Sequence, residues 1–533
     1  MQTSQNHKIS YGSGGFYVEP VENLESYCLP SSENIDNYSS GQTLEQYCTL
    51  ESASTSNSFP YQNSPPALSF SSNNSPLSKL ESNSYVLRPQ NSLEIASGSP
   101  EDDSYLTHLD DLTHKINELE SAMLGTNADM LDIYGPIMPE EADSFLLEAE
   151  KWKKMDVVSR GDLKEMLYTC AKAMAVNDME TTEWMISESR KMVSISGNPI
   201  QRLGAYVVES LVARMAATGS TIYKSLKCSE PTGNELLSYM HVLYEVCPYF
   251  KFGYMSANGA IAEALKEERE VHIIDFQISQ GTQWVSLIQA LARRPGGPPK
   301  IRISGVDDSF SSYARGGGLD IVGKRLSALA QSCNVPFEFN AVRVPASQVQ
   351  LKDLELRPYE AVAVNFALIL HHVPDETVNS HNHRDRLLRL AKQLSPKVVT
   401  LVEQEFNTNH APFLQRFVET MNYYFSVFDS IDAALPREHK ERINVEQHCL
   451  AREVVNLIAC EGAERVERHE LLNKWRMRFT MSGFTPYPLN SVINASIKDL
   501  LLSYHGHYTL EEKDGALFLG WKNQVLIASC AWR

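Results

Sequence analysis

The feature that most constrains the fold is an alternation of short apolar runs with amphipathic segments after residue 270. The apolar runs are rich in β-branched residues, which favour strands, and the segments between them place Leu, Ile and Val at helical spacing. The runs are VHIIDF, IRISGV, FEFNAV, EAVAVNF and KVVTLVEQE, and the segments include WVSLIQALARR, LDIVGKRLSALAQSC and RDRLLRLAKQL. Because these strands are apolar almost throughout, the pattern predicts an α/β fold with a doubly wound, mostly parallel sheet covered by helices on both faces.

Two other parts of the chain depart from this alternation. Residues 145–268 show only helical patterns, and the final stretch YTLEEKDGALFLGWKNQVLIASCAW predicts short antiparallel strands. Before that stretch, FLQRFVETMNYYFSVFDSIDAAL and EQHCLAREVVNLIACEG supply more helices than simple crossovers need. We therefore expect a mainly helical cap over 151–268 and an α/β core over 269–533, with the extra helices of the core joining the cap.

The first 150 residues have a different composition. Up to about residue 100 they are rich in Ser, Asn, Gln and Pro without a sustained period, so they cannot bury enough apolar surface to offset the entropy of ordering. We expect residues 1–150 to be a disordered acidic tail. Within it, 104–124 predicts an amphipathic helix that either folds onto a partner or packs or fluctuates on its own. Its apolar residues are Leu106, Leu109, Leu112, Ile116, Leu119 and Met123.

Charge divides the chain at the same place. The tail holds 23 acidic and 4 basic residues, a net charge of −19 against −18 for the whole chain, so residues 151–533 are close to neutral. Strong binding to duplex DNA needs a concentrated basic face that releases counterions from phosphates. The clusters KWKK at 151–154 and ARRP at 292–295 favour solvated helix faces instead, and we expect no strong direct binding to DNA.

Cysteine usage and hydropathy bear on the compartment. Nine cysteines are scattered without a CxxC pair, which is typical of reduced thiols. The start MQTSQNHKISYGSGGF has no basic-then-apolar signal, and no apolar run approaches the roughly 18 residues of a membrane span. These patterns predict a soluble intracellular protein without a membrane partner.

The turn after the VHIID strand resembles a cofactor-binding turn only in part. In dinucleotide sites an acid ends the strand, and several glycines then let the cofactor approach the backbone. Here Asp275 is followed by Phe276, Gln277, Ile278, Ser279, Gln280 and Gly281, so bulky side chains stand where bare backbone is needed. The sequence therefore predicts no cofactor. Candidates for a vestigial pocket are Asp275, Gln277, Gly281, Asp307, Asn365 and His371.

Two further motifs are weaker. Asp307 ends the strand run IRISGV, where a doubly wound fold places an acid on a ribose hydroxyl, but a capping or solvated acid explains it better. The stretch GLDIVGKR at 318–325 fits the phosphate-loop spacing but has Arg325 where Ser or Thr must hold Mg²⁺. We interpret it as a loop and the start of a helix.

A group of histidines follows the EAVAVNF strand. His371, His372, His381 and His383 lie in one loop, and adjacent loop histidines rarely give zinc its geometry, so we predict no metal site. A general base at the carboxyl end of the strand is the better functional interpretation of His371. No G-x-S-x-G, H-E-x-x-H or paired-cysteine motif accompanies it, and we predict no catalytic residue.

Named blocks of residues then occur in a familiar order. From about residue 150 to the C-terminus the chain resembles the GRAS family of plant regulatory proteins, with leucine-rich regions at about 160–260 and 319–351 on either side of the VHIID block. The one departure is Cys530, where the family has Ser. The matching residues are Val271, His272, Ile273, Ile274, Asp275, Pro396, Phe417, Tyr424, Arg452, Glu453, Trp475, Gly483, Leu519, Trp521, Ala531 and Trp532.

The resemblance implies a fold and a function. It implies a methyltransferase-like core with a helical cap, and a non-enzymatic regulator of transcription in light, hormone or stress signalling. Within the family, the chain is most similar to the phytochrome A signal transduction, or scarecrow-like, branch. The expected partners are DNA-binding transcription factors, other regulatory proteins and, as homo- or heterodimers, other GRAS proteins. The expected location is the nucleus, with a share in the cytoplasm.

Two alternatives stay open at this point. One is an S-adenosylmethionine-dependent methyltransferase of small molecules, with Asp275, Asp307, Asn365 and His371 or His372 around the cofactor. The other is a ligand sensor, since a concave site at strand ends can outlive the loss of its chemistry. We also expect Trp521 and Trp532 to be buried, because apolar residues flank them on strands.

Overall fold

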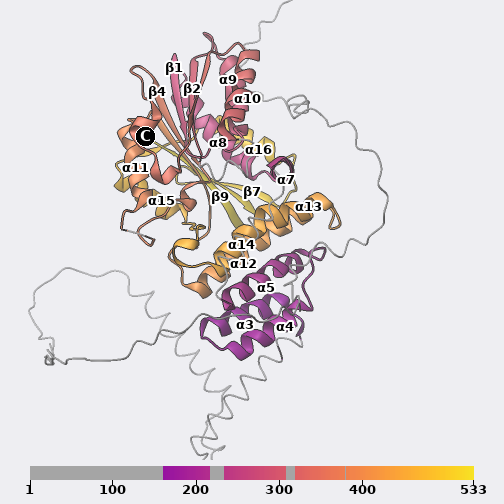
Figure 1. The fold of residues 1–533 in the computed structure, drawn as a ribbon. Coiled ribbons are helices and arrows are strands. Elements are labelled where there is room, and N and C mark those ends of the chain that lie inside the picture. Colours follow the sequence, from indigo (N-terminus) through magenta and orange to yellow (C-terminus); the bar gives the residue numbers. More distant parts are fainter. Residues whose placement is uncertain (1–155, 157–159, 217–232, 308–317, 379) are drawn as a thin grey trace, which may run out of the picture. The chain divides into compact units, whose positions relative to one another are not determined.

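The computed structural model describes residues 156, 160–216, 233–307, 318–378 and 380–533. The predictions for the acidic tail, for its amphipathic stretch 104–124 and for the KWKK cluster lie outside the described residues. The described strands form one nine-stranded sheet (Figure 1). They are β1 (Glu270–Asp275), β2 (Lys300–Val306), β3 (Phe337–Val342), β4 (Ala361–Ala367), β5 (Val398–Gln404), β6 (Pro486–Tyr487), β7 (Tyr508–Lys513), β8 (Ala516–Trp521) and β9 (Gln524–Trp532).

The sheet is parallel at one end and antiparallel at the other. Its order is β3-β2-β1-β4-β5-β9-β8-β7, with β6 also pairing with β9. The five strands from β3 to β5 run parallel, whereas β9 runs antiparallel to β5 and β8. The predicted doubly wound, mostly parallel sheet with an antiparallel finish is confirmed. The chain leaves β1 toward β2 on one side and reaches β4 later on the other, so the topological switch point lies between β1 and β4.

Helices cover both faces of the parallel part. One buried cluster joins α8, α9 and α10 to β1, β2 and β4, and a second joins α11 and α15 to the other face (Figure 1). The longer helices are α3 (Leu163–Ala175), α4 (Met179–Arg190), α5 (Pro199–Met215), α7 (Gly233–Val246), α8 (Tyr249–Ala264), α9 (Thr282–Ala292), α10 (Gly318–Ser332), α11 (His383–Gln393), α12 (Phe413–Asp432), α13 (Lys440–Val445), α14 (Ala451–Ala459), α15 (Leu472–Met481) and α16 (Ser491–Leu501). Among the described helices none is both long and apolar enough to cross a bilayer.

Local sequence explains where several helices begin. Asp162 caps α3 by accepting hydrogen bonds from the amides of Lys164 and Glu165. Asn198 and Gln201 form a reciprocal capping box at the start of α5, with a proline as the first helical residue. These caps satisfy amides that have no partner within the helix, so each helix has a defined first turn before tertiary packing begins.

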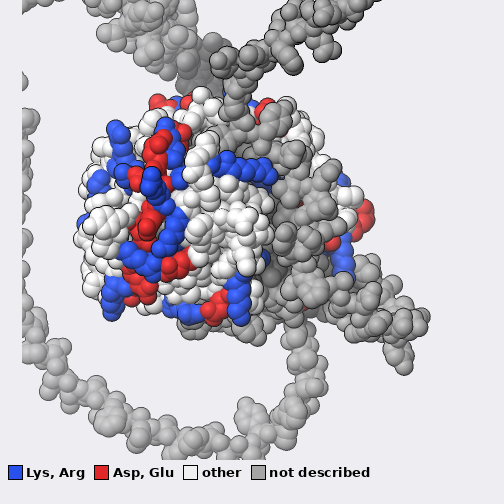
Figure 2. All heavy atoms as spheres, turned by 90° about the horizontal axis from the view of Figure 1, so that it is seen from above, with Lys and Arg blue, Asp and Glu red and all other residues white. Residues whose placement is uncertain are grey.

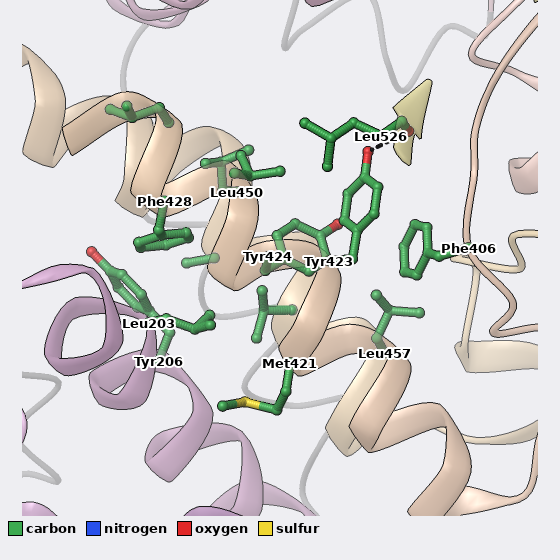
Figure 3. Close-up of a cluster of buried hydrophobic side chains, with 14 of the residues drawn as sticks. Leu203, Tyr206, Phe406, Met421, Tyr423, Tyr424, Phe428, Leu450, Leu457 and Leu526 are labelled. Atoms are coloured by element: carbon green, nitrogen blue, oxygen red, sulfur yellow. Dashed lines mark hydrogen bonds between the residues drawn. The ribbon is translucent and has the colours of Figure 1, made fainter. Parts of the chain in front are cut away.

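The remaining helices form a layer with an apolar interior of its own. Helices α12 and α14 lie beside α3 and α5, although about 200 residues separate them in sequence (Figure 1). Figure 3 shows Phe428 of α12 directed toward Leu203 and Tyr206 of α5, with 6.1 Å between the ring centroids of Phe428 and Tyr206. A buried ion pair reinforces this contact, since Arg202 binds Glu446 at 3.0 Å. The layer is thus assembled from two separate segments of the chain, one before the parallel strands and one after them.

Aromatic side chains connect this layer to the sheet. Tyr423 of α12 stacks on Phe406, with 4.0 Å between ring centroids, and donates a hydrogen bond to the carbonyl of Leu526 in β9 (Figure 3). Trp521 donates to the carboxylate of Asp429 at 2.7 Å. Trp521 and Trp532 are 1% and 2% exposed, so the prediction that both are core residues is confirmed.

Candidate functional site

The strand register brings predicted pocket residues together at the switch point. Asp275, the last residue of β1, lies opposite Gly305 of β2 and Asn365 of β4. Parallel strands of such sheets present their carboxyl ends to ligands at this place. We call the group made by Asp275, Gln277, Gly281, Gln283 and Asn365 the switch-point site.

The carboxylate of Asp275 is held entirely by the protein. Its Oδ2 accepts a hydrogen bond from the indole nitrogen of Trp284 at 2.8 Å, and its Oδ1 accepts from Asn365 Nδ2 at 3.1 Å and from the backbone amide of Gln277 at 3.2 Å. The side chain is 1% exposed. An acid that would bind a ligand hydroxyl in a working site instead binds the helix and strand beside it.

These contacts continue into a buried polar chain. Asn365 Nδ2 also donates to Gln283 Oε1 at 3.1 Å, and Thr400 donates to Asn365 Oδ1 at 2.8 Å. Gln283 in turn donates to Asn258 Oδ1 at 3.2 Å. This hydrogen-bond network links α8, α9, β1, β4 and β5, so the polar side chains in it satisfy one another in the core.

The side chains of the turn fill the space beside the backbone. Phe276 stacks on Phe366 with 4.9 Å between ring centroids, and Phe276 and Ile278 are both buried. Ile278 lies so close to Gly305 that a Cβ there would come within 3.0 Å of it. Gly281 starts α9 at φ 68°, and a Cβ on it would lie 2.9 Å from Val322 of α10. Packed side chains therefore stand where a phosphate or methionine moiety would meet bare amides.

Burial alters the protonation of this acid. Removal from water raises the pKa of Asp275 to about 6, although its three hydrogen-bond donors act in the opposite direction. The charge of Asp307, which is also buried, adds to the increase. Asp275 and Asp307 thus lie near each other as the strand pattern indicated, and the amide of Asp307 donates to Val342 of β3 at 3.1 Å.

The phosphate-loop alternative conflicts with the structure. Residues 318–325 lie inside α10, which begins at Gly318 and contains Gly323. A Cβ on Gly323 would come within 2.5 Å of Phe339, so this glycine allows a helix to pack closely on β3. The interpretation of the motif as a helix start is confirmed.

His371 belongs to a different group of residues. It lies on a short 3₁₀ helix (Leu370–His372) after β4, and its Nδ1 is 2.6 Å from Glu403 Oε2 of β5. Its ring stacks on His469 with 4.4 Å between centroids, and its Nε2 is 3.7 Å from Glu467 Oε2. We call His371, His372, Glu403, Glu467 and His469 the histidine cluster.

The loop histidines divide between two places. His372 packs on His371 and is 3.2 Å from Glu467 Oε1, whereas His381 and His383 contact each other with 6.0 Å between centroids. Burial opposes the charge of His372, but Glu467 outweighs it and raises the pKa of His372. Burial and neighbouring positive charge hold the pKa of His469 well below its ordinary value, so this ring is neutral.

Most residues of the family blocks are structural. Val271, Ile273 and Ile274 are buried in β1, and His272 reaches across to Ser304 at 2.7 Å and to Arg302 at 2.9 Å. The rest of the set is as follows: Phe417, Tyr424, Trp475, Leu519, Trp521, Ala531 and Trp532 are buried, Pro396, Arg452 and Glu453 are half-buried, and Gly483 adopts φ 86°.

Side chains at the block positions stabilise the fold by contacts between elements. Tyr424 of α12 donates a hydrogen bond to Glu453 of α14, and burial raises the pKa of that carboxyl. Cys530, the departure from the family pattern, is buried, and the indole nitrogen of Trp532 lies 3.2 Å from its sulfur. A thiol therefore serves this position as a small buried group.

Sequence patterns alone do not single out Glu403, Glu467 and His469 as site residues. Glu403 continues the apolar strand KVVTLVEQE, and Glu467 and His469 lie in the segment RVERHE before α15. The alternation of acid and histidine in RVERHE is a usable signal. Its pairing with His371, about 100 residues earlier, is a product of the tertiary fold.

Comparison with known proteins defines the class. Residues 163–533 match the GRAS domain family, and the chain belongs to this family. It is 55% identical to Scarecrow-like transcription factor PAT1 of Arabidopsis thaliana, over 97% of this chain and the whole of that protein. It is 54% identical to Chitin-inducible gibberellin-responsive protein 2 of Oryza sativa subsp. japonica, over 95% of this chain and 91% of that protein.

A solved structure supports the same assignment. The crystal structure of SCL7 from Oryza sativa is similar to this chain with a TM-score of 0.62 and 34% identity, covering 70% of this chain and 99% of that one. The family expected from the VHIID block and the terminal tryptophans is confirmed.

Proposed function

We propose that this protein is a non-enzymatic regulator of transcription in plant signalling, which acts in the nucleus through contacts with DNA-binding transcription factors. The observation that carries the proposal is the packed switch-point site. Phe276 and Ile278 fill the turn, and Trp284 and Asn365 bind the carboxylate that a cofactor would need. A relative whose whole length aligns with 97% of this chain is named as a transcription factor.

The surface charges support contact with proteins rather than directly with DNA. Figure 2 shows one face on which basic and acidic side chains are interleaved along a band beside uncharged surface. Ion pairs such as Lys397 with Glu268 at 3.0 Å and Lys300 with Glu270 at 3.9 Å neutralise charges near the start of the strands. Arg294 of the ARRP cluster donates hydrogen bonds to the carbonyls of Leu265 and Glu268, so donors of its guanidinium group are engaged within the fold.

A tethering experiment tests the regulatory role. The full chain fused to an unrelated DNA-binding domain should change transcription of a reporter in plant cells, whereas the chain without that domain should leave it unchanged. Mobility-shift measurements should show only weak, salt-sensitive binding to duplex DNA. Tight, sequence-specific binding by the unfused chain would contradict the proposed dependence on DNA-binding partners.

A binding measurement tests the methyltransferase alternative. Titration of the full chain with S-adenosylmethionine in a calorimeter should give no saturable heat, because packed side chains occupy the turn. Saturable binding that disappears in Asp275→Asn would favour the methyltransferase or the ligand sensor.

Partner capture with and without residues 1–150 would show which part of the chain holds the regulatory partners.

A further inference from the structure

Three side chains of the histidine cluster point ligand atoms at one place. His371, Glu467 and His469 each offer one atom, and these atoms all lie within 4.8 Å of one another. Glu467 Oε2 is 3.7 Å from His371 Nε2 and 3.7 Å from His469 Nε2. All three side chains are almost fully buried. Two imidazoles and one carboxylate form a ligand set that zinc uses in proteins.

The other ring nitrogens are already engaged. Glu403 accepts from the backbone amide of Leu370 through Oε1 and lies 2.6 Å from His371 Nδ1 through Oε2, which places the proton on Nδ1 and leaves Nε2 with its lone pair. Thr408 Oγ1 lies 3.1 Å from His469 Nδ1. Contacts of this kind orient histidines that ligate metals, because they fix the tautomer and the plane of the ring.

Two of the converging atoms have no hydrogen-bond partner among the described residues. They are Glu467 Oε2 and His469 Nε2, and His469 is 0% exposed. A buried polar atom left without a partner destabilises the fold, and native proteins rarely keep two of them facing each other. A cation between them would satisfy both atoms and would balance part of the negative charge of Glu403 and Glu467.

We propose that His371, Glu467 and His469 bind a divalent transition-metal ion, with zinc as the best match to two imidazoles and one carboxylate. The rings of His371 and His469 are stacked, 19° from parallel with 4.4 Å between centroids, and an imidazole lone pair lies in the plane of its ring. At least one ring must therefore turn out of the stack when both Nε2 atoms bind one ion. Three protein ligands leave a fourth position of a tetrahedral ion to water. The ion would fasten the loop before α15 to the carboxyl ends of β4 and β5.

One side chain of the histidine cluster reaches solvent. His372 is 38% exposed and lies against His371, with 4.0 Å between ring centroids. The proposal does not depend on the regulatory function, since a structural ion is compatible with a regulator or an enzyme.

A second group in the described residues provides a matched control. Asp375, His410 and Glu470 also lie close together, but Arg384 and Arg478 already contact both carboxylates. These arginines supply the positive charge that an ion would bring. His410→Gln should therefore leave metal binding unchanged, and it makes the same chemical change as a substitution of His469.

The test uses the full chain with zinc or cobalt alone as the probe. After exposure to ZnCl₂ and gel filtration, the wild type and His410→Gln should each retain one ion per chain, and Glu467→Gln and His469→Gln should lose it. Glu403→Gln should lower the affinity by about 10- to 100-fold, as expected when the group that orients a ligand is changed. Melting curves in EDTA show whether each variant folds without metal.

Cobalt keeps the proposal testable even if a variant does not fold. Cobalt in the wild-type site should give visible d–d bands without the ultraviolet charge-transfer band that thiolate ligands produce, which separates this site from the cysteines. Absence of retained zinc in the wild type, equal retention by Glu467→Gln, or a thiolate band would each overturn the proposal.

Discussion

Two groups of polar residues lie at the carboxyl ends of neighbouring strands, and they differ in whether their polar atoms have hydrogen-bond partners. In the switch-point site Asp275 and Asn365 have protein partners for the oxygens of both side chains. In the histidine cluster Glu467 Oε2 and His469 Nε2 lie 3.7 Å apart, and neither has a hydrogen-bond partner in the described part of the chain. The side chains of the switch-point site therefore fill that site and satisfy one another. The histidine cluster, in contrast, keeps two buried polar atoms that could still bind a ligand.

This difference predicts contrasting responses to mutation. Changes in the switch-point site should act on stability alone, because its groups bind one another. Changes in the histidine cluster should act on metal binding first and on stability through the ion.

Removal of the ring at Phe276 should have the largest effect. Phe276→Ala deletes a buried ring that stacks on Phe366 and should lower the free energy of unfolding by about 4 kcal/mol, as for other buried aromatic truncations. Denaturant unfolding measures this change. Tyr359→Ala, at a side chain 97% exposed, should cost less than about 0.5 kcal/mol. Similar losses at the two positions would show that Phe276 does not fill the turn.

Loss of the Asp275 carboxylate should be nearly as severe. Asp275→Ala leaves Trp284, Asn365 and the amide of Gln277 without an acceptor, and should cost about 3 kcal/mol. Binding of regulatory partners should fall together with the melting temperature. Asp320→Ala, at an exposed ion pair with Arg343, should change stability by less than about 1 kcal/mol. Partner loss at an unchanged melting temperature would mean that Asp275 is a contact residue.

The pH dependence of stability should identify the same carboxyl. The folded protein raises the pKa of Asp275 from 3.8 to about 6, so it holds this proton more tightly than the unfolded chain does. The stability that Asp275 contributes is therefore full below about pH 4 and declines as the pH rises toward 6, by up to about 3 kcal/mol. Asp275→Asn should lack this decline in urea titrations across that range. Parallel profiles for the two proteins would refute the assignment.

Zinc should stabilise the wild type through the histidine cluster. At a free zinc concentration about 100 times the dissociation constant, the free energy of unfolding should rise by about 2.7 kcal/mol over the value in EDTA. Asp275→Asn should keep this increment, and Glu467→Gln should lose it. An equal increment in Glu467→Gln would place the ion elsewhere and would remove the contrast between the two groups.

A pair of threonines gives the finest comparison. Thr400 donates to Asn365 in the switch-point site, and Thr408 contacts His469 in the histidine cluster. Each change to Val should cost about 1 kcal/mol of stability. Only Thr408→Val should weaken zinc binding, by about 10-fold or more, because it frees the ring of His469 to turn. Weaker zinc binding in both variants would show that the two groups are coupled.

Much of the fold follows from local patterns. The apolar runs after residue 270 predict the parallel strands because they need cover on both faces, and the alternation in the last 30 residues predicts the antiparallel finish. The burial of Trp521 and Trp532 follows from their apolar neighbours. The turn after Asp275 is readable as well, since six consecutive residues show that bulky groups replace glycines.

The candidate site was only partly readable. The strand pattern names Asp275 and Asn365 as candidates for one vestigial pocket, and the strand register places them opposite each other. The sequence predicts only that Trp284 belongs to a helix. The hydrogen bonds of Gln283 to Asn365 and of Trp284 to Asp275 depend on how α9 packs on the sheet. The packing of helices on the sheet therefore determines which polar side chains bind Asp275 and Asn365 in the switch-point site.

By itself, the sequence determined the sheet, the helical covering and the family, because these depend on the period and order of residues along the chain. The tertiary structure alone decided that His371 meets Glu467 and His469, and that Asp275 is bound by Trp284 and Asn365. The physical reason is distance in sequence: strand and helix periods act over a few residues, whereas the partner of a buried polar atom is chosen by whichever segment packs against it, here as much as about 100 residues away.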